Sequence, residues 1–199
     1  MIMPTISNSH WWGFASLPKD TDLPTHHIIY DDGTHFDDPM TLVCQIDCAE
    51  YHRNHSDEEV LQLLPHEGML YFFAYLDYFF GELDADCPGL APWSSDYFRV
   101  LYSPTSEDLH THRIVDEDGK DYCRAPQWYP SDRVLFTQPR AFTDEVECEY
   151  PNHLCLLQLD SLDFNDLNFF DCGVLFFMIT PEDLKAKRFD NTKCQLYSY

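Results

Sequence analysis

The hexapeptide GMLYFF occupies residues 68–73, and a close copy of it, GVLFFM, occupies residues 173–178. Every position after the glycine is apolar, which is typical of a strand buried on both faces at the centre of a sheet. The tripeptide QID at 45–47 precedes the first copy, and QLD at 158–160 precedes the second. Two motifs repeated in the same order predict an internal duplication of a strand–loop–strand unit. Within the two copies, Leu70, Phe72, Leu175 and Phe177 are expected to point to the core.

Further strands are predicted where apolar residues alternate or run together between turn signals. Because strands dominate, the sequence predicts a single domain, residues 1–199, that is mainly antiparallel β with a few short helices. Its related halves span about 42–77 and 154–184. The expected strands are 42–47, 68–75, 98–102, 154–159, 172–179 and 195–199, with an edge strand at 134–136.

Two short helices are predicted from capping signals. Ser56 can cap a first turn while Glu59 reaches back to the cap amide, and Pro65 ends that helix. Thr180 followed by Pro181 is typical of a second helix start. Asp47 and Asp160 follow equivalent strands, so they either accept backbone amides of the next turn or converge on a cation.

The charge balance restricts the class of partner. Thirty-five acidic residues against twelve Lys and Arg give a formal net charge of −23 at pH 7. Phosphate backbones and anionic membranes would be repelled, so neither nucleic acid nor a membrane is an expected partner. A basic protein would be attracted. Alternatively, the charge only keeps an aromatic-rich domain in solution.

The sequence also predicts a cytoplasmic location. The apolar runs at 69–76 and 174–179 are shorter than the roughly 20 residues of a membrane helix. The N-terminal segment has no basic stretch before an apolar one, so no secretory signal is expected. Eight cysteines form no CxxC motif, and Cys44, Cys155 and Cys172 lie in apolar stretches, as is typical of thiols in a reducing compartment.

Several motifs together resemble the YwqG-like family of bacterial proteins. They are WGFASLP at 12–18, LVCQID at 42–47, LPHEGMLYFF at 64–73, FRVLY at 98–102, LLQLDS at 156–161 and the segment 169–199. The resemblance implies a roll-like, mainly β fold with internal pseudo-twofold symmetry. The family is a domain of unknown function without a catalytic motif to carry over, and some members occur beside toxin genes. Segment 103–152 departs most from the family pattern.

A cluster of imidazoles and carboxylates suggests a metal site. His26, His27, Asp31 and His35 lie close together in the sequence, with further aspartates beside them. Such ligands suit zinc, manganese or iron. The alternative function is therefore an uncharacterised enzyme, metal-dependent or other, that uses this His/Asp-rich segment. Loops also collect Asp and His without binding metal, so a solvated loop is the other interpretation.

No enzyme motif supports catalysis. The chain has no G-x-S-x-G, no P-loop and no G-x-G-x-x-G. No catalytic residue and no cofactor other than a divalent metal is therefore predicted.

The function expected first is a non-enzymatic acidic protein that binds a basic partner. The resemblance extends this expectation to an immunity protein that neutralises a co-encoded toxin. The predicted partner-binding residues combine acids with aromatic anchors, which are expected to be exposed. They are Trp93, Asp116, Glu117, Asp118, Asp121, Trp128, Tyr129, Glu145, Glu147 and Glu149.

Overall fold

The computed structural model describes residues 8–30, 32–54, 62–116, 118–123, 144–161 and 167–198. Within these ranges eleven strands pair antiparallel, so the predicted mainly β class is confirmed. The first sheet has the order β1-β5-β6-β7, with β1 His10–Trp11, β5 Thr41–Asp47, β6 Met69–Ala74 and β7 Phe98–Ser103. The second sheet has the order β11-β10-β9, with β9 Leu154–Asp160, β10 Gly173–Ile179 and β11 Lys193–Ser198.

Two smaller strand pairs and several short helices complete the described chain. The strand β2 Ser16–Pro18 pairs with β8 Leu109–Thr111, and β3 Thr25–Ile29 pairs with β4 His35–Pro39. The α-helices are α1 Cys48–Asn54, α2 Asp144–Glu149 and α3 Pro181–Lys185; the 3-10 helices are η2 Asp77–Phe80 and η4 Phe189–Asn191. None of the described helices is long and apolar enough to cross a membrane.

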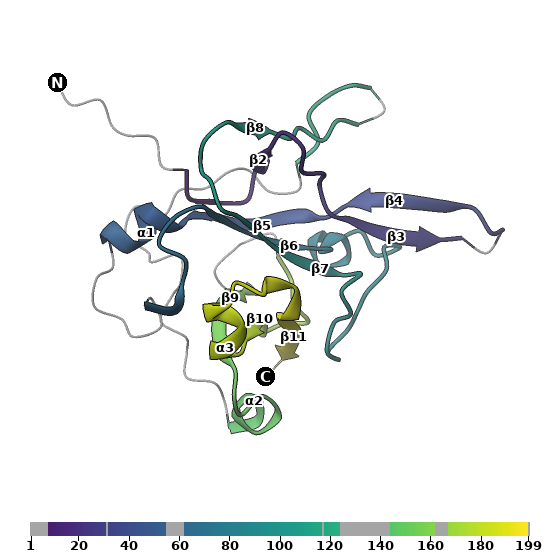
Figure 1. Cartoon of the computed structure of the whole chain (residues 1–199). Helices are drawn as coiled ribbons and strands as arrows, with labels where there is room; N and C mark the ends of the chain where they lie inside the picture. Colours follow the sequence, from purple (N-terminus) through teal and green to yellow (C-terminus); the bar gives the residue numbers. More distant parts are fainter. Residues whose placement is uncertain are drawn as a thin grey trace.

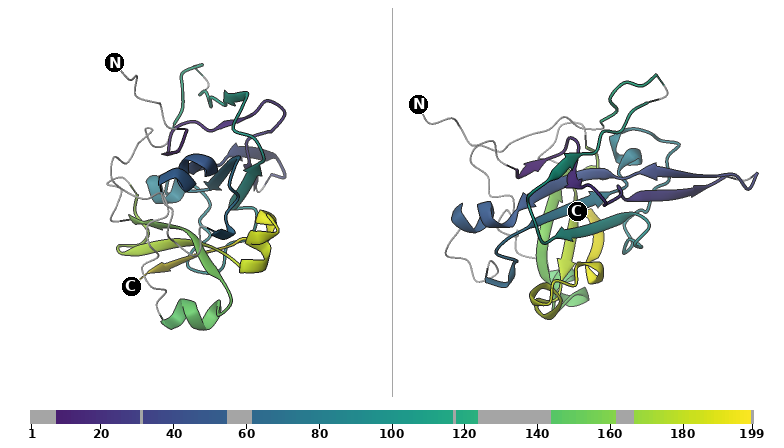
Figure 2. Two further views of the ribbon diagram at one scale, coloured as in Figure 1. Left: turned by 60° about the vertical axis from the view of Figure 1, so that its left-hand side comes forward. Right: turned by 45° about the horizontal axis from the view of Figure 1, so that its top comes forward.

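The two sheets pack against each other, and both are covered on their outer faces. Figure 2 shows the strands of the second sheet running across those of the first. In Figure 1, β2 and β8 lie on the outer side of the first sheet and α2 lies on the outer side of the second. Apolar side chains form a central layer between the two sheets and an outer layer on the far face of each sheet. This explains why the central strands β6 and β10 are apolar at every position.

The central layer contains the four residues predicted to point to the core. Leu70, Phe72, Leu175 and Phe177 are fully buried in one cluster between the sheets, so that prediction is confirmed. The rings of Phe72 and Phe177 meet edge to face, with centroids 5.4 Å apart. Alternate residues of β6 and β10 enter the outer layers.

The two copies of the repeat pair in the same register. Asp47 lies opposite Met69 in the first unit, and Asp160 lies opposite Val174 in the second. Each unit also has an irregularity at the same place, between Leu42 and Cys44 in β5 and opposite Phe177/Met178 in β9–β10. A duplicated unit would have this correspondence; the duplication itself and the superposition of the units stay predictions.

The glycine that opens each hexapeptide is required by close backbone contact. A Cβ on Gly68 would lie 2.1 Å from the Ser103 carbonyl oxygen, and Gly68 has a φ of +87°. A Cβ on Gly173 would lie 2.3 Å from the Phe169 carbonyl oxygen. Any larger residue would push the neighbouring backbone away, so the repeat of glycine has a steric cause.

The helix predictions had mixed outcomes. Thr180 caps α3, because its Oγ accepts a hydrogen bond from the Asp183 amide at 3.2 Å, and Pro181 begins the helix as predicted. After Asp47 the sequence predicted a turn, but α1 begins there instead. The Glu50 amide donates to Asp47 Oδ1 at 3.0 Å, so this carboxylate accepts a backbone amide, as the non-cation alternative predicted. The segments 55–61 and 134–136 lie outside the described residues.

Candidate protein-binding surface

The strands β3 and β4 form a hairpin arm that projects from the packed sheets. Figure 1 and the right-hand view of Figure 2 show it extending beyond β5, β6 and β7. Within the described residues, each of its strands pairs only with the other. We call residues 25–39, with the exception of 31, the arm. An isolated two-stranded ribbon is marginally stable in water, so contacts at the base of the arm must support it.

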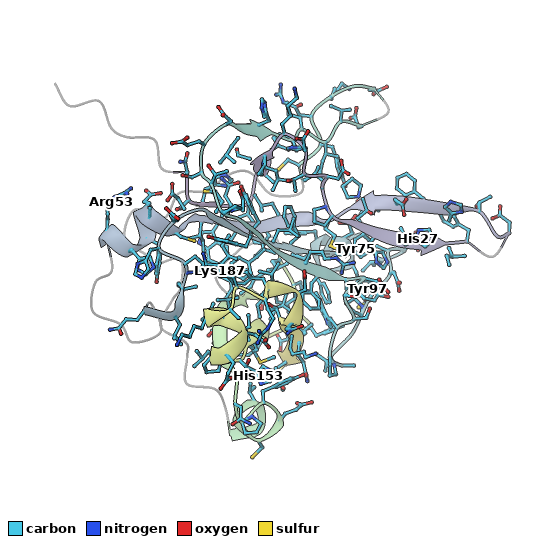
Figure 3. The ribbon with its side chains drawn as sticks, in the orientation of Figure 1. His27, Arg53, Tyr75, Tyr97, His153 and Lys187 are labelled. Atoms are coloured by element: carbon cyan, nitrogen blue, oxygen red, sulfur yellow. The ribbon has the colours of Figure 1, made fainter. Side chains whose placement is uncertain are left out.

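His26 fixes the base of the arm to the body of the protein. Its side chain is only 4% exposed and lies between the rings of Tyr75 and Tyr97, with centroid distances of 4.2 and 4.5 Å. Since a carbonyl only accepts, His26 Nδ1 carries the proton that it donates to the Asp96 carbonyl at 2.8 Å. Figure 3 shows Tyr75 and Tyr97 near this base, with His27 farther out along the arm.

A carboxylate completes the contacts around His26. Asp86 Oδ2 lies 3.4 Å from His26 Nε2 and accepts a hydrogen bond from the Tyr97 hydroxyl at 2.5 Å. Burial, together with this bond, raises the pKa of Tyr97 to about 12, so the phenol keeps the proton it donates. These groups come from three separate segments of the chain. They therefore fix the position of the arm as well as packing around His26.

The tip of the arm is closed by a tight turn. Asp32 Oδ1 accepts hydrogen bonds from the amide and hydroxyl of Thr34, at 2.9 and 2.6 Å. Gly33 adopts a φ of +81°, which a residue with a side chain rarely does. The bonds from Thr34 also lower the pKa of Asp32, so its negative charge is maintained at the tip.

Large apolar side chains of the arm are exposed to solvent. Ile29 is 71% exposed, and Tyr30 and Phe36 are each 52% exposed. Single exposed apolar residues are common on protein surfaces, but here three occur on one projecting element. Aromatic side chains such as those of Tyr30 and Phe36 are also enriched in protein interfaces.

The arm lies in a stretch of the chain without any cationic residue. Residues 20–52 include eight Asp and Glu but no Lys or Arg. In the arm itself, Asp32, Asp37 and Asp38 are acidic, and Asp37 accepts from His27 at 2.7 Å. The arm therefore combines exposed apolar groups with acidic side chains and contains no Lys or Arg.

The predicted metal ligands do not converge. His26 and His27 are consecutive in β3, so they point to opposite faces, and His26 is buried against the tyrosines. His27 and His35 are neighbours, with ring centroids 5.3 Å apart, while Asp31 lies outside the described residues. Among the residues that the structure describes, no group of three or more His, Cys, Asp or Glu side chains could hold a metal ion. The prediction that His26 shares a site with His27 and His35 is wrong.

The family model described as a domain of unknown function, DUF1963, matches residues 9–129 and 122–197. The chain belongs to the DUF1963 family. No curated protein matches the chain.

Trp93 of this DUF1963 domain is not the exposed anchor that the sequence predicted. It is 6% exposed, its ring stacks on Phe79 with centroids 6.0 Å apart, and its Nε1 donates to the Gly89 carbonyl at 3.0 Å. Aromatic residues between prolines and glycines resemble surface anchors in a sequence, but here the loop folds back over the core. The expected exposure is therefore wrong.

The acidic turn at 116–121 is exposed, but bases compensate its charge. Asp118 lies 3.3 Å from Lys120 Nζ, and Asp121 pairs with Arg113. Asp116 accepts from the Lys120 amide at 2.8 Å. This turn consequently presents less net negative charge than the arm.

Glu149 is occupied by contacts within the DUF1963 domain. It accepts hydrogen bonds from the Tyr197 hydroxyl at 2.6 Å and from Gln195 Nε2 at 3.3 Å, so it ties α2 to β11. The remaining predicted partner residues lie outside the described part of the chain: Glu117, Trp128 and Tyr129 entirely, and Glu145 and Glu147 in their side chains.

A small pocket lies where the arm joins the DUF1963 body. Asp38, Pro39 and Tyr122 are among the residues that line it, and its volume is about 30 Å³. That is room for a water molecule, whereas ligand pockets usually measure roughly 300–1,000 Å³. This pocket does not fit a small-molecule substrate.

The sequence did not predict the hairpin arm. Residues 26–38 are expected from the sequence to form a loop or a metal site, because Asp and His are frequent there. The Asp32-Gly33 turn between apolar residues could have indicated the hairpin, and the absence of Lys and Arg from 20 to 52 could have indicated its acidic character.

Proposed function

We propose that this protein is a non-enzymatic binding protein that holds a basic protein partner through the β3–β4 arm. The proposal rests on one observation: the arm exposes Ile29, Tyr30 and Phe36 beside Asp32 and Asp37. The apolar side chains supply affinity when they are removed from water, since full burial of one such side chain contributes about 1.5–3 kcal/mol.

Electrostatic attraction supports a basic partner. A net charge of −23 raises the rate at which a cationic protein reaches the surface, and the effect weakens as salt is added. No Lys or Arg occurs between residues 20 and 52, so the acids of the arm also attract a cationic partner at short range. The acidic turn at 116–121 contributes to long-range attraction.

The resemblance to bacterial YwqG-like proteins extends the proposal to an immunity protein in the cytoplasm. Toxins that cut nucleic acid need a basic cleft to bind phosphate. A narrow acidic arm with apolar side chains is a suitable shape to enter and block such a cleft. The partner would then be a co-encoded basic toxin, and neutralisation would require binding but no catalysis.

The proposal is tested by partner capture with matched baits. The wild-type chain is compared with an arm variant, Ile29→Ser with Phe36→Ser, and with a control, Leu83→Ser. Leu83 is 74% exposed, so the control removes an equally exposed apolar side chain outside the arm. Bound proteins from the source cell are identified by mass spectrometry, and the product of an adjacent gene is tested as a purified protein.

A basic protein retained by the wild type and by Leu83→Ser, but lost with the arm variant, is the expected result. If the arm variant retains the same proteins as the wild type, the arm does not bind the partner. If the retained protein is acidic, electrostatic attraction does not select the partner.

A further inference from the structure

The hydrogen-bond pattern of the arm determines which backbone groups face outward. The Tyr30 amide donates to the Thr34 carbonyl at 2.9 Å, and the Met40 amide donates to the Pro24 carbonyl at 2.8 Å. In an antiparallel ladder, hydrogen-bonded pairs alternate with pairs that are not hydrogen-bonded. Even-numbered residues therefore bond across the arm, and odd-numbered residues direct their N–H and C=O groups away from it.

On β4 these outward groups belong to His35 and Asp37. Within the part of the chain that the structure describes, no strand lies along this edge and no backbone bond reaches these groups. The next outward residue, Pro39, has no N–H and lies at the base of the arm. An open edge of this kind is a template for one more strand.

The outer edge of β4 is better suited to a cationic strand than the edge of β3. Adjacent strands place opposite side chains about 4.5–5.5 Å apart. A strand added beside β4 would therefore lie next to Phe36, Asp37 and Asp38, whereas β3 has no acidic residue. In addition, His26 holds β3 against the body of the protein.

We propose that the basic partner binds by adding an extended cationic segment to the open edge of β4. This inference rests on the proposed function and specifies its mode of recognition. The N–H and C=O groups of His35 and Asp37 would bond to the backbone of the added segment. An apolar residue of that segment would lie opposite Phe36, and Lys or Arg would lie opposite Asp37 and Asp38.

A second copy of the chain is a poorer occupant of the same edge. Each copy has a net charge of −23, and the segment 20–52 contains no base that could pair with the acids of another arm. Two such edges would bring like charges together, which is unfavourable. A cationic segment removes this repulsion.

The test uses the full chain, labelled with ¹⁵N, and a blocked synthetic peptide, Thr-Val-Lys-Lys-Val-Thr. This peptide presents the same residue order in either strand direction. The control peptide has Glu in place of Lys. Peptide is titrated into the wild type and into His35→Pro, which removes one outward N–H without changing the formal charge or the ladder inside the arm. Proline is tolerated at such edge positions.

The matched control is His27→Pro. His27 is also an outward histidine on the same face of the arm, but it lies on β3. A second control, His35→Ala, removes the imidazole and keeps the N–H. Dispersed amide spectra establish that each variant is folded.

We expect the largest shifts at the amides of His35 and Asp37, at least tenfold weaker binding to His35→Pro, and binding within about twofold of wild type for His27→Pro and His35→Ala. Equal effects of the two proline substitutions, or no effect of either, would overturn strand addition, and equal binding of the Glu peptide would overturn the preference for a cationic segment. Arm signals that change with protein concentration alone would assign the edge to a second copy and also overturn it.

The outcome is separable from that of the proposed function. If the natural partner tolerates His35→Pro but is lost on Phe36→Ser, the arm binds a basic protein through side chains, and only strand addition is wrong. If neither change affects the natural partner, the proposed function is wrong as well.

Discussion

Replacing Phe72 with Ala should strongly destabilise the protein. Phe72 and Phe177 are both fully buried, and their rings meet edge to face between the two sheets, 5.4 Å apart. Removing a buried Phe side chain typically costs about 3–5 kcal/mol, from lost burial and from the cavity that remains. Since domains of this kind are stable by roughly 5–15 kcal/mol, the loss should be a large part of the total.

The assay is equilibrium unfolding in urea, monitored by circular dichroism, for Phe72→Ala, for Phe177→Ala and for the double variant. Because the rings contact each other, the two changes should not be additive, and a coupling of about 0.5–1.5 kcal/mol is expected. Phe36→Ala is the matched control; this ring is 52% exposed and its removal should cost less than about 0.5 kcal/mol. If Phe72→Ala does not fold, Phe72→Leu provides the smaller truncation.

A cost below about 1 kcal/mol for Phe72→Ala would contradict its place between the sheets. Additive effects of the two substitutions would contradict the contact between the rings.

Three further predictions concern the repeat, the base of the arm and the buried thiols. Gly173→Ala should destabilise the protein in urea, because the new Cβ would lie 2.3 Å from the Phe169 carbonyl oxygen; an unchanged midpoint would contradict this. His26→Ala should speed amide hydrogen exchange in the arm, with a loss of about 1–2 kcal/mol from the hydrogen bond and ring contacts, and unchanged protection would count against the anchoring role. Burial raises the pKa of Cys44 and Cys194, so their contribution to stability is complete below the unfolded thiol pKa of about 8.5 and is lost as the pH rises further. The free energy of unfolding should therefore fall above pH 9, and it should fall less in Cys44→Ala. A rise in the free energy of unfolding above pH 9 would contradict this prediction.

The central strands could be predicted from the sequence because burial on both faces leaves a continuous apolar run. The cap at Thr180 could also be predicted from the sequence, since its hydrogen bond is made within three residues. In both cases the deciding interactions are local or are imposed by the core.

The arm could not be predicted in the same way, because its strands depend on distant contacts. His26 is held by Tyr75, Tyr97 and Asp96, which lie far away in the chain. The Asp residues of the arm have low strand propensity, so tertiary contacts decide their conformation. Burial of Trp93 has a similar cause, since it depends on packing against Phe79.

The most direct test of whether a basic partner binds the arm is to measure the association rate constant of the two proteins by stopped flow at several ionic strengths. The variant Asp37→Asn with Asp38→Asn is compared with Asp116→Asn and Asp118→Asn, which removes equal charge from the acidic turn. One partner charge about 10 Å from two carboxylates gains about 0.8 kcal/mol in water, or roughly fourfold in rate at low salt. The account predicts that the arm variant is slower than the turn variant by a similar factor and less sensitive to salt. Equal rates for the two variants, or rates that do not change with ionic strength, would contradict it.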